Sequence, residues 1–139
     1  MKVKFKKLHP NAVTPKYAKF GDAGMDLTAT SRWHEASNVC YGTGIAMEIP
    51  QGYVGLVFPR SSVAKKELLL SNCVGVIDSG YRGEITAKFK TTNGGSHLYE
   101  VGERICQIII LPYPEIEFDE VETLSETERG DGGYGSSGV

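Results

Sequence analysis

The sequence predicts an all-β protein, either a sandwich or a barrel, and three observations favour this class. Apolar and polar residues alternate with a period of two in several short segments, as in half-buried strands. Turn signals lie close together between these segments, and almost none of the chain has helical periodicity. Many short strands with closely spaced turns are typical of sandwiches and barrels. The 139 residues are enough for one domain with its own core.

The expected elements follow in chain order. Alternation predicts strands at residues 3–5, 45–49 and 85–90, and turns are expected at residues 20–22, 41–44, 50–52, 78–80 and 92–95. One segment, residues 61–69, has the pattern of a short helix, which Ser61 or Ser62 would cap. Residues 105–111 are apolar on both faces apart from Gln107. We therefore expect a strand buried on both sides there, and the second side is a candidate subunit interface.

Composition and charge argue against several function classes. Lys and Arg number 15 against 17 Asp and Glu, a net charge of −2 without the basic surplus typical of nucleic-acid binding. No apolar stretch approaches the roughly 20 residues of a membrane helix, and the N-terminus does not lead into a signal-peptide core. We expect no nucleic-acid or membrane partner, and a cytoplasmic location, or one inside the host cell if the chain is viral. The three cysteines are expected to be free thiols.

The C-terminal segment differs in composition from the rest, so we divide the chain into a β-barrel domain, residues 1–124, and an arm, residues 125–139. The arm is rich in glycine and has no apolar periodicity. Composition alone favours a disordered terminus. The alternative is an arm that becomes ordered on an anion. Glycine lets backbone N–H groups approach phosphate, and Arg129, Ser136 and Ser137 supply further donors.

Two polar residues interrupt apolar strands and are candidates for a site. Asp26 either faces the surface or lies near a metal, directly or through water. Gln107, if buried, must find hydrogen-bond partners in the protein or in a ligand. Neither residue decides the function by itself.

Two further clusters each allow two interpretations. Arg60, Ser61 and Ser62 stand at the possible helix start, where they form either a plain N-cap or an anion site. The segment around Asp78 and Tyr81 is either an ordinary hairpin turn or a site in which Asp78 is a base and Tyr81 a flat apolar wall.

Taken in order, these clusters and the tail resemble the five motifs of the trimeric dUTP pyrophosphatases (dUTPases), at residues 23–29, 59–64, 72–85, 102–108 and 129–138. The resemblance covers almost the whole chain, and it reverses the preference for a disordered tail. The departures are mild. Met25 stands where tyrosine is common, Tyr134 where phenylalanine is usual and Ser137 where threonine is frequent, and each keeps the required chemistry.

The resemblance implies a distorted jelly-roll β-barrel with one short helix and a flexible C-terminal arm, assembled as a homotrimer. One subunit would supply the first, second and fourth motifs of each active site, a neighbour the third, and the third subunit the arm. The implied reaction is hydrolysis of dUTP to dUMP and pyrophosphate, in which Asp78 activates water for attack on the α-phosphate. Mg²⁺ would bridge the phosphates, with Asp26 contacting it through water. The activity would keep uracil out of DNA and supply dUMP for thymidylate synthesis.

The resemblance also implies the residues that bind the substrate. The phosphate chain would be held by Arg60, Ser61, Ser62 and Gln107, uracil by backbone groups near Asn72, Gly75 and Ile77, the deoxyribose by Tyr81, and the arm would contribute Arg129, Tyr134, Gly135, Ser136 and Ser137. Tyr134 would stack on the base, and the arm would close as a lid that excludes water.

Two alternatives belong to other function classes. A dCTP deaminase has a similar fold and needs a catalytic glutamate, for which Glu84 stands in the right hairpin. Release of ammonia from dCTP, in place of pyrophosphate from dUTP, would identify it. A non-enzymatic nucleotide sensor is the second alternative, and the presence of Asp78 and a complete fifth motif argues against it as the sole role.

Overall fold

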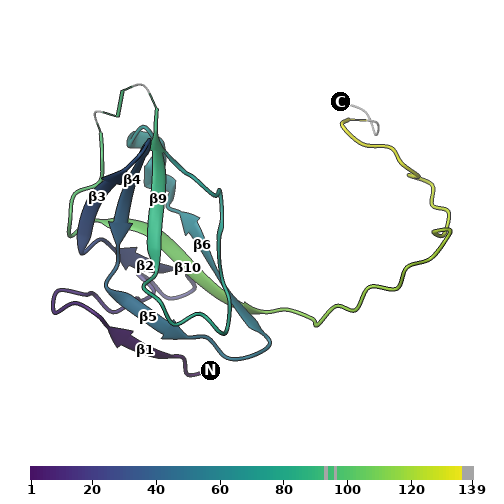
Figure 1. Cartoon of the computed structure of the whole chain (residues 1–139), viewed down its shortest axis with the longest axis horizontal. Coiled ribbons are helices and arrows are strands. Elements are labelled where there is room, and N and C mark those ends of the chain that lie inside the picture. The colour runs from purple at the N-terminus through teal and green to yellow at the C-terminus, as the bar shows by residue number, and fades with distance from the viewer. Residues whose placement is uncertain (93, 96, 136–139) are drawn as a thin grey trace.

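The computed structural model describes residues 1–92, 94–95 and 97–135, which form antiparallel sheets joined by short connections (Figure 1). One sheet has the order β2–β10–β6–β8, a second has the order β3–β4–β9–β7, and β1 pairs with β5. The strands are β1 (Lys4–Lys7), β2 (Met25–Thr28), β3 (Ser31–Glu35), β4 (Asn38–Gly42), β5 (Ile45–Glu48), β6 (Tyr53–Pro59), β7 (Leu68–Leu70), β8 (Gly75–Ile77), β9 (Thr86–Thr91) and β10 (Arg104–Pro112). The all-β prediction is confirmed.

The core is built from apolar side chains of both four-stranded sheets. Its largest fully buried members include Tyr41, Tyr99, Phe89, Leu27, Ile45, Ile49, Ile85, Ile105 and Ile108. The predicted alternation holds in β9, where Ala87 and Phe89 are buried while Lys88 and Lys90 are exposed. It weakens in β5, which pairs with β1 and in which Ala46 is buried together with its neighbours.

The expected helix at residues 61–69 is wrong. Ser61–Lys65 form a single 3₁₀ turn without a side-chain N-cap, and none of its residues is buried. Glu67 then adopts a left-handed backbone with φ of 48°. Leu68 and Leu70, both buried, pair with β9 instead. Strand pairing and burial therefore decide the structure of residues 68–70, because the local sequence pattern has no strong preference for a helix.

Strand β10 is the centre of its sheet, between β2 and β6. A register shift between Arg104 and Cys106 lets Ile105 and Cys106 both enter the core. Beyond this bulge, Ile108 is buried while Ile109 and Leu111 are half-buried on the other face. The strand is where it was expected, but its second face is only half-buried in the single chain, so burial on both sides stays a prediction.

The segment after β10 leaves the barrel and runs away from both sheets (Figure 1). Its described residues, 113–135, are exposed apart from Gly132, and none belongs to the core. Ser136 and Ser137 lie outside the described residues. In the described part of the chain, no helix has the length and apolar character needed to cross a membrane.

Candidate active site

The carboxylate of Asp26, on β2, is held between two arginines. Its Oδ1 accepts a 2.7 Å hydrogen bond from Nε of Arg60, and its Oδ2 accepts one of 2.9 Å from Nη1 of Arg104. The side chains of Asp26 and Arg60 are only 17% and 24% exposed, so water screens this ion pair less than a surface pair. Strand register explains the meeting, because Asp26 lies opposite Gln107 on β10 and Gln107 lies opposite Phe58 on β6.

Gln107 lies beside this cluster, and its amide has partners in the protein. Its Nε2 donates a 3.1 Å hydrogen bond to the carbonyl of Pro59. Gly24 makes room for the side chain, because a Cβ at that position would stand 2.4 Å from Oε1 of Gln107. Sequence reasoning gave no role to Gly24 or to Arg104, although both stand within the motifs.

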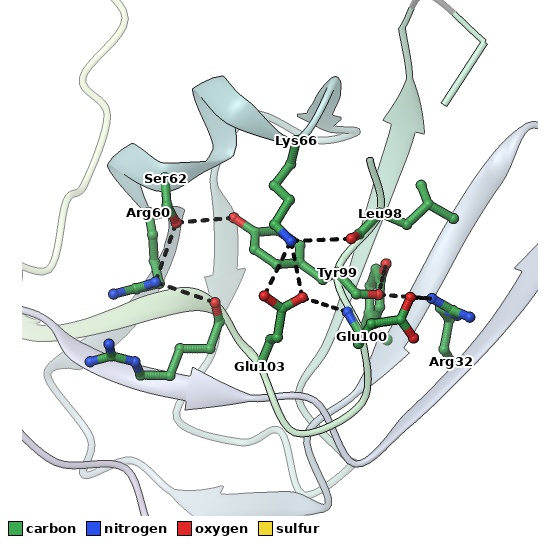
Figure 2. Close-up of polar contacts among 10 residues, drawn as sticks. Arg32, Arg60, Ser62, Lys66, Leu98, Tyr99, Glu100 and Glu103 are labelled. Carbon is green, nitrogen blue, oxygen red and sulfur yellow. Dashed lines mark hydrogen bonds and ion pairs between the residues drawn. The ribbon is translucent and has the colours of Figure 1, made fainter. Parts of the chain in front are cut away.

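Arg60 also reaches the 3₁₀ turn. Its Nη1 donates a 3.2 Å hydrogen bond to Oγ of Ser62, as Figure 2 shows. Ser61, the neighbouring hydroxyl, is exposed. One chain thus gathers two guanidinium groups and two hydroxyls beside an amide, the donor set that phosphate oxygens accept. The predicted residues Asp26, Arg60, Ser61, Ser62 and Gln107 are brought together, and we call them the phosphate cluster.

The thiol of Cys106 is buried close to the charges of Asp26 and Arg60. Burial raises the pKa of Cys106 to about 12, and the nearby negative charge of Asp26 adds to the shift while Arg60 opposes it. The thiol is therefore neutral and packs as a small apolar group.

The third motif forms an exposed edge of the same sheet. β8 pairs with β6, with Ile77 opposite Gly55 and Gly75 opposite Val57. Asp78 follows β8 and is exposed, as is Asn72 before it.

The turn after Asp78 has a defined geometry. The backbone N–H of Tyr81 donates to the carbonyl of Asp78 at 3.1 Å. The hydroxyl of Tyr81 donates to the carbonyl of Glu84 at 2.9 Å. A Cβ at Gly83 would stand 2.4 Å from that hydroxyl oxygen, so glycine is needed under the ring. The ring of Tyr81 remains 44% exposed and forms a flat apolar surface near Asp78.

Asp78 and the phosphate cluster do not meet within one chain. Asp78 follows the end of β8 that pairs with the start of β6, whereas Arg60 follows the last residue of β6. The seven residues of β6 span roughly 20 Å. The described part of the arm is also apart from the phosphate cluster, because it leaves the barrel after Pro112, opposite Tyr53 at the start of β6, and then runs away from the sheets (Figure 1).

The described arm residues contact one another. Nε of Arg129 donates to the carbonyl of Gly132 at 3.0 Å. Tyr134 is fully exposed, with a left-handed backbone at φ of 50°, and Gly135 follows at φ of 93°. These residues are not brought to the phosphate cluster within the single chain.

The residues present fit a magnesium ion held mainly by its substrate. No group of three or more histidine, cysteine, aspartate or glutamate side chains forms a metal cage in the described residues. Mg²⁺ usually keeps several waters and binds proteins through one or two carboxylates plus substrate phosphates. The Asp26 carboxylate, already held by two arginines, retains lone pairs for a water of such an ion.

Comparisons with known proteins show the family and the fold. A family model described as dUTPase matches residues 10–138. The chain belongs to the dUTPase family. It is 43% identical over 148 residues to the deoxyuridine 5'-triphosphate nucleotidohydrolase of Escherichia phage T5, with 98% of each sequence covered. It is 42% identical over 143 residues to the protein of that name from Finegoldia magna, with 99% of each covered.

Solved dUTPase structures share the fold. The dUTPase of Staphylococcus bacteriophage 80alpha, solved with dUPNHPP, aligns with a TM-score of 0.83 at 30% identity over 99% of both chains. A mutant dUTPase of phage phi11 of S. aureus, described with a structural Mg(II) ion, aligns with a TM-score of 0.73 at 25% identity over 88% of this chain and 98% of that one. The expected dUTPase fold, a distorted jelly roll, is confirmed.

Proposed function

We propose that the chain is a dUTP diphosphatase, which hydrolyses dUTP to dUMP and pyrophosphate. One observation carries the proposal. Residues from three separate motifs form the phosphate cluster, in a chain related over its whole length to deoxyuridine 5'-triphosphate nucleotidohydrolases. In the cell, this reaction keeps uracil out of DNA and provides dUMP for thymidylate synthesis, in the cytoplasm or inside an infected host.

The phosphate cluster binds and orients the triphosphate. Arg60 supplies positive charge, and its direction is fixed by Asp26. Ser61, Ser62 and Gln107 add neutral donors around the phosphate oxygens. Charge on the leaving pyrophosphate increases during the reaction, so donors fixed in advance stabilise the transition state more than the ground state.

Asp78 is the proposed base. Its exposed carboxylate follows β8 and is available to take a proton from water. The water attacks the α-phosphorus, its proton passes to Asp78, and the bond from this phosphorus to the bridging oxygen of pyrophosphate breaks. A positioned base contributes about 10²–10⁴ in rate. Mg²⁺, bound by the phosphates with Asp26 behind a water, would neutralise charge on the triphosphate.

The active site is proposed to be shared within a homotrimer. The roughly 20 Å along β6 between Asp78 and Arg60 supports this proposal, because a second chain would bring the two residues to one site. The outer face of this sheet supports assembly, because it carries an apolar patch formed by Val54, Leu56, Phe58, Val76, Ile109 and Leu111. An apolar patch of this kind on a sheet face is typical of subunit interfaces.

The arm and the hairpin are proposed to select and enclose the nucleotide. Backbone groups near Asn72, Gly75 and Ile77 pair with uracil, and Tyr81 lies against the deoxyribose, where a ribose hydroxyl has no partner. A site that leaves a buried group unpaired rejects the wrong base by about 10⁴–10⁵.

The arm of the third subunit completes the enclosure. It would bring Arg129, Gly135, Ser136 and Ser137 to the γ-phosphate. Tyr134 would stack on the base, a contact worth about 1–3 kcal/mol.

The deaminase alternative is disfavoured by the contacts of Glu84. Its Oε1 accepts a 2.7 Å hydrogen bond from the backbone N–H of Gly44. A Cβ on Gly42 would stand 2.6 Å from the same oxygen. The carboxylate therefore ties the 43–44 turn to the segment before β9, a structural role that argues against a catalytic one.

A substrate panel tests the activity. Pyrophosphate release is measured from deoxynucleoside and ribonucleoside triphosphates with Mg²⁺, and we expect it from dUTP alone. Ammonia from dCTP, or nucleotide binding without turnover, would instead support the alternatives. Asp78→Asn should retain nucleotide binding and lose most turnover, and a near-normal kcat in that variant would remove Asp78 as the base.

Mixed assemblies test the shared site. Asp78→Asn chains and Arg60→Ala chains carry different tags and are refolded together in equal amounts. Each variant alone is expected to be inactive, whereas the mixture should recover up to about a quarter of wild-type activity, because some sites then combine two intact residues. No recovery in verified mixed trimers, or an active monomer, would contradict a site shared between chains.

A further inference from the structure

Tyr99 is a buried residue outside the five motifs whose hydroxyl reaches the phosphate cluster. It lies in the connection between β9 and β10 and is 1% exposed. Its hydroxyl oxygen is 3.4 Å from Oγ of Ser62, and either atom can donate. Figure 2 shows the hydroxyl pointing at Ser62, which also binds Arg60. The hydroxyl of a core residue is thus directed to the site and not into the core.

The ring of Tyr99 is fixed on several sides. It packs edge-on against Tyr41 with centroids 6.2 Å apart, and it lies 5.9 Å from the ring of Phe89. Nζ of Lys66 stands 4.9 Å from its centroid, at cation–π distance. Lys66 is held there by Glu103, whose carboxylate oxygens lie 3.0 and 3.1 Å from Nζ.

The backbone of Tyr99 is fixed as well. Its carbonyl accepts hydrogen bonds from the hydroxyl of Tyr41 at 2.9 Å and from Nη1 of Arg32 at 3.0 Å. A side chain with so many fixed neighbours presents its polar atom at one position. This rigidity is what a site needs from a residue that supports a binding group without touching the ligand.

The direction of the proton between the two hydroxyls matters for phosphate binding. Oγ of Ser62 already accepts from Arg60. If Tyr99 also donates to Oγ, then the proton of Ser62 is free to be donated outward. A hydroxyl that accepts two hydrogen bonds is polarised and becomes a stronger donor itself. Phosphate oxygens are acceptors only, so they gain from a serine in this state.

We propose that Tyr99 is a positioning residue for the triphosphate. Its hydroxyl donates to Ser62 and turns the Ser62 proton toward a phosphate oxygen, beside the guanidinium of Arg60. This inference rests on the proposed function, because the phosphate chain is taken as the ligand of Ser62. The inference adds to the binding residues a core residue, Tyr99, that orients one of them without contacting the ligand.

Tyr99→Phe tests the inference, with Thr30→Val as its control. The half-buried hydroxyl of Thr30 donates a 3.1 Å hydrogen bond to the carbonyl of Gly42, and Thr30 belongs neither to the phosphate cluster nor to the contacts that fix Tyr99. In Tyr99→Phe we expect kcat/KM for dUTP to fall about 3–10-fold, the loss of one hydrogen bond, mainly through KM. Thr30→Val should keep wild-type kinetics. Equal losses in both variants, or no loss in Tyr99→Phe, would overturn the inference.

Binding measurements separate positioning from a general loss of structure. Calorimetry with the α,β-imido analogue of dUTP should show the same 3–10-fold weakening in Tyr99→Phe. The affinity for deoxyuridine, which lacks phosphates, should stay unchanged. Weakening of both ligands by the same factor would indicate a structural role and contradict the proposal.

A double-mutant cycle with Ser62→Ala completes the test. If Tyr99 acts through Ser62, Tyr99→Phe adds no further loss in the Ser62→Ala background. Additive losses would contradict an effect of Tyr99 through Ser62. A normal kcat/KM in Ser62→Ala would contradict it too, and this variant tests the proposal even if Tyr99→Phe does not fold. A wild-type chain that binds the analogue but releases no pyrophosphate from dUTP would overturn the proposed function. The calorimetric comparison of the analogue with deoxyuridine would still decide the role of Tyr99.

Discussion

Nε of Arg60 donates a 2.7 Å hydrogen bond to Oδ1 of Asp26, across 34 positions of the sequence. The contact joins the end of β6 to the middle of β2, with β10 between them. Asp26 therefore has a role that does not depend on any metal, because it sets the direction of the guanidinium. Arg104 binds the second carboxylate oxygen and keeps Asp26 from turning.

The substitution Asp26→Asn should damage activity more than stability. An amide keeps the volume but removes the charge and one of the two acceptor oxygens, so one arginine loses its hydrogen bond and the other keeps only a neutral acceptor. We expect unfolding free energy to fall by about 1–3 kcal/mol, and kcat/KM for dUTP by about 10–100-fold as Arg60 loses its orientation. Urea denaturation and steady-state kinetics measure the two effects.

A matched control for this variant is Glu48→Gln. It breaks an exposed ion pair, in which the side chain of Glu48 is 48% exposed and that of Lys4 is 82% exposed. Such a pair contributes roughly 0–1 kcal/mol, and activity should not change. Wild-type kinetics in Asp26→Asn would show that other contacts place Arg60.

Gly24→Ala should displace the Gln107 amide. The added Cβ would stand 2.4 Å from Oε1 and 3.3 Å from Cβ of Gln107, so the side chain must move away from the cluster. A loss of about tenfold in kcat/KM is expected if one phosphate hydrogen bond is lost. Gln107→Ala is the companion variant. The double variant should be no worse than the poorer single one, and additive losses would show that Gly24 acts elsewhere.

Deleting residues 129–139 should leave a folded, assembled protein with little activity. None of the described residues of this segment, 129–135, belongs to the core, so the thermal midpoint and the solution mass, near three times 15.1 kDa, should remain. Turnover should fall because the lid no longer excludes water. Full activity in the truncated protein would show that the arm is dispensable.

One of the three cysteines should react rapidly with a thiol reagent in the native protein. Cys73 is exposed, whereas Cys40 and Cys106 are buried. Burial raises the pKa of both buried thiols, so their thiolates are scarce as well as inaccessible. Absorbance titration should count one fast thiol per chain, lost in Cys73→Ser, and three in guanidinium chloride. Three fast thiols in the native protein would contradict the described burial.

Alkaline pH should destabilise the protein through Cys106. Its pKa rises from 9.0 to about 12 on folding, first through burial and then through the charge of Asp26. The stabilisation by the neutral thiol is complete below pH 9 and is lost as pH rises toward 12. At pH 10 we expect a loss on the order of 1 kcal/mol relative to pH 7. Cys106→Ala should show a correspondingly smaller decrease in urea denaturation, and an identical decrease would refute this assignment.

The strands that could be predicted from the sequence are those in which one face is buried and the other is exposed to solvent. In β9, Ala87 and Phe89 alternate with exposed lysines, and the period of two is visible. In β3 all five residues are exposed, so no alternation marks it. The helix expected at residues 61–69 is wrong because the leucines there are buried by pairing with β9, a partner about twenty positions away.

The site was predictable to the extent that its residues stand in motifs. Asp26, Arg60, Ser62 and Gln107 were expected, and strand register brings them together. Tyr99 carries no local signal, because its contact with Ser62 spans 37 positions and depends on core packing. The roles of Asp78 and of the arm remain predictions, since both stand apart from the phosphate cluster in a single chain.

The placement of Asp78 and Arg60 at opposite ends of β6 has a consequence for gene dosage. With a shared site, an isolated polypeptide is catalytically silent, so output depends steeply on how many copies are present. Dilution below the dissociation threshold would switch the population off without any inhibitor. One copy that lacks Asp78 or Arg60, incorporated beside two sound ones, would disable a single shared site and leave the other two working, so a mixed trimer would keep most of its output.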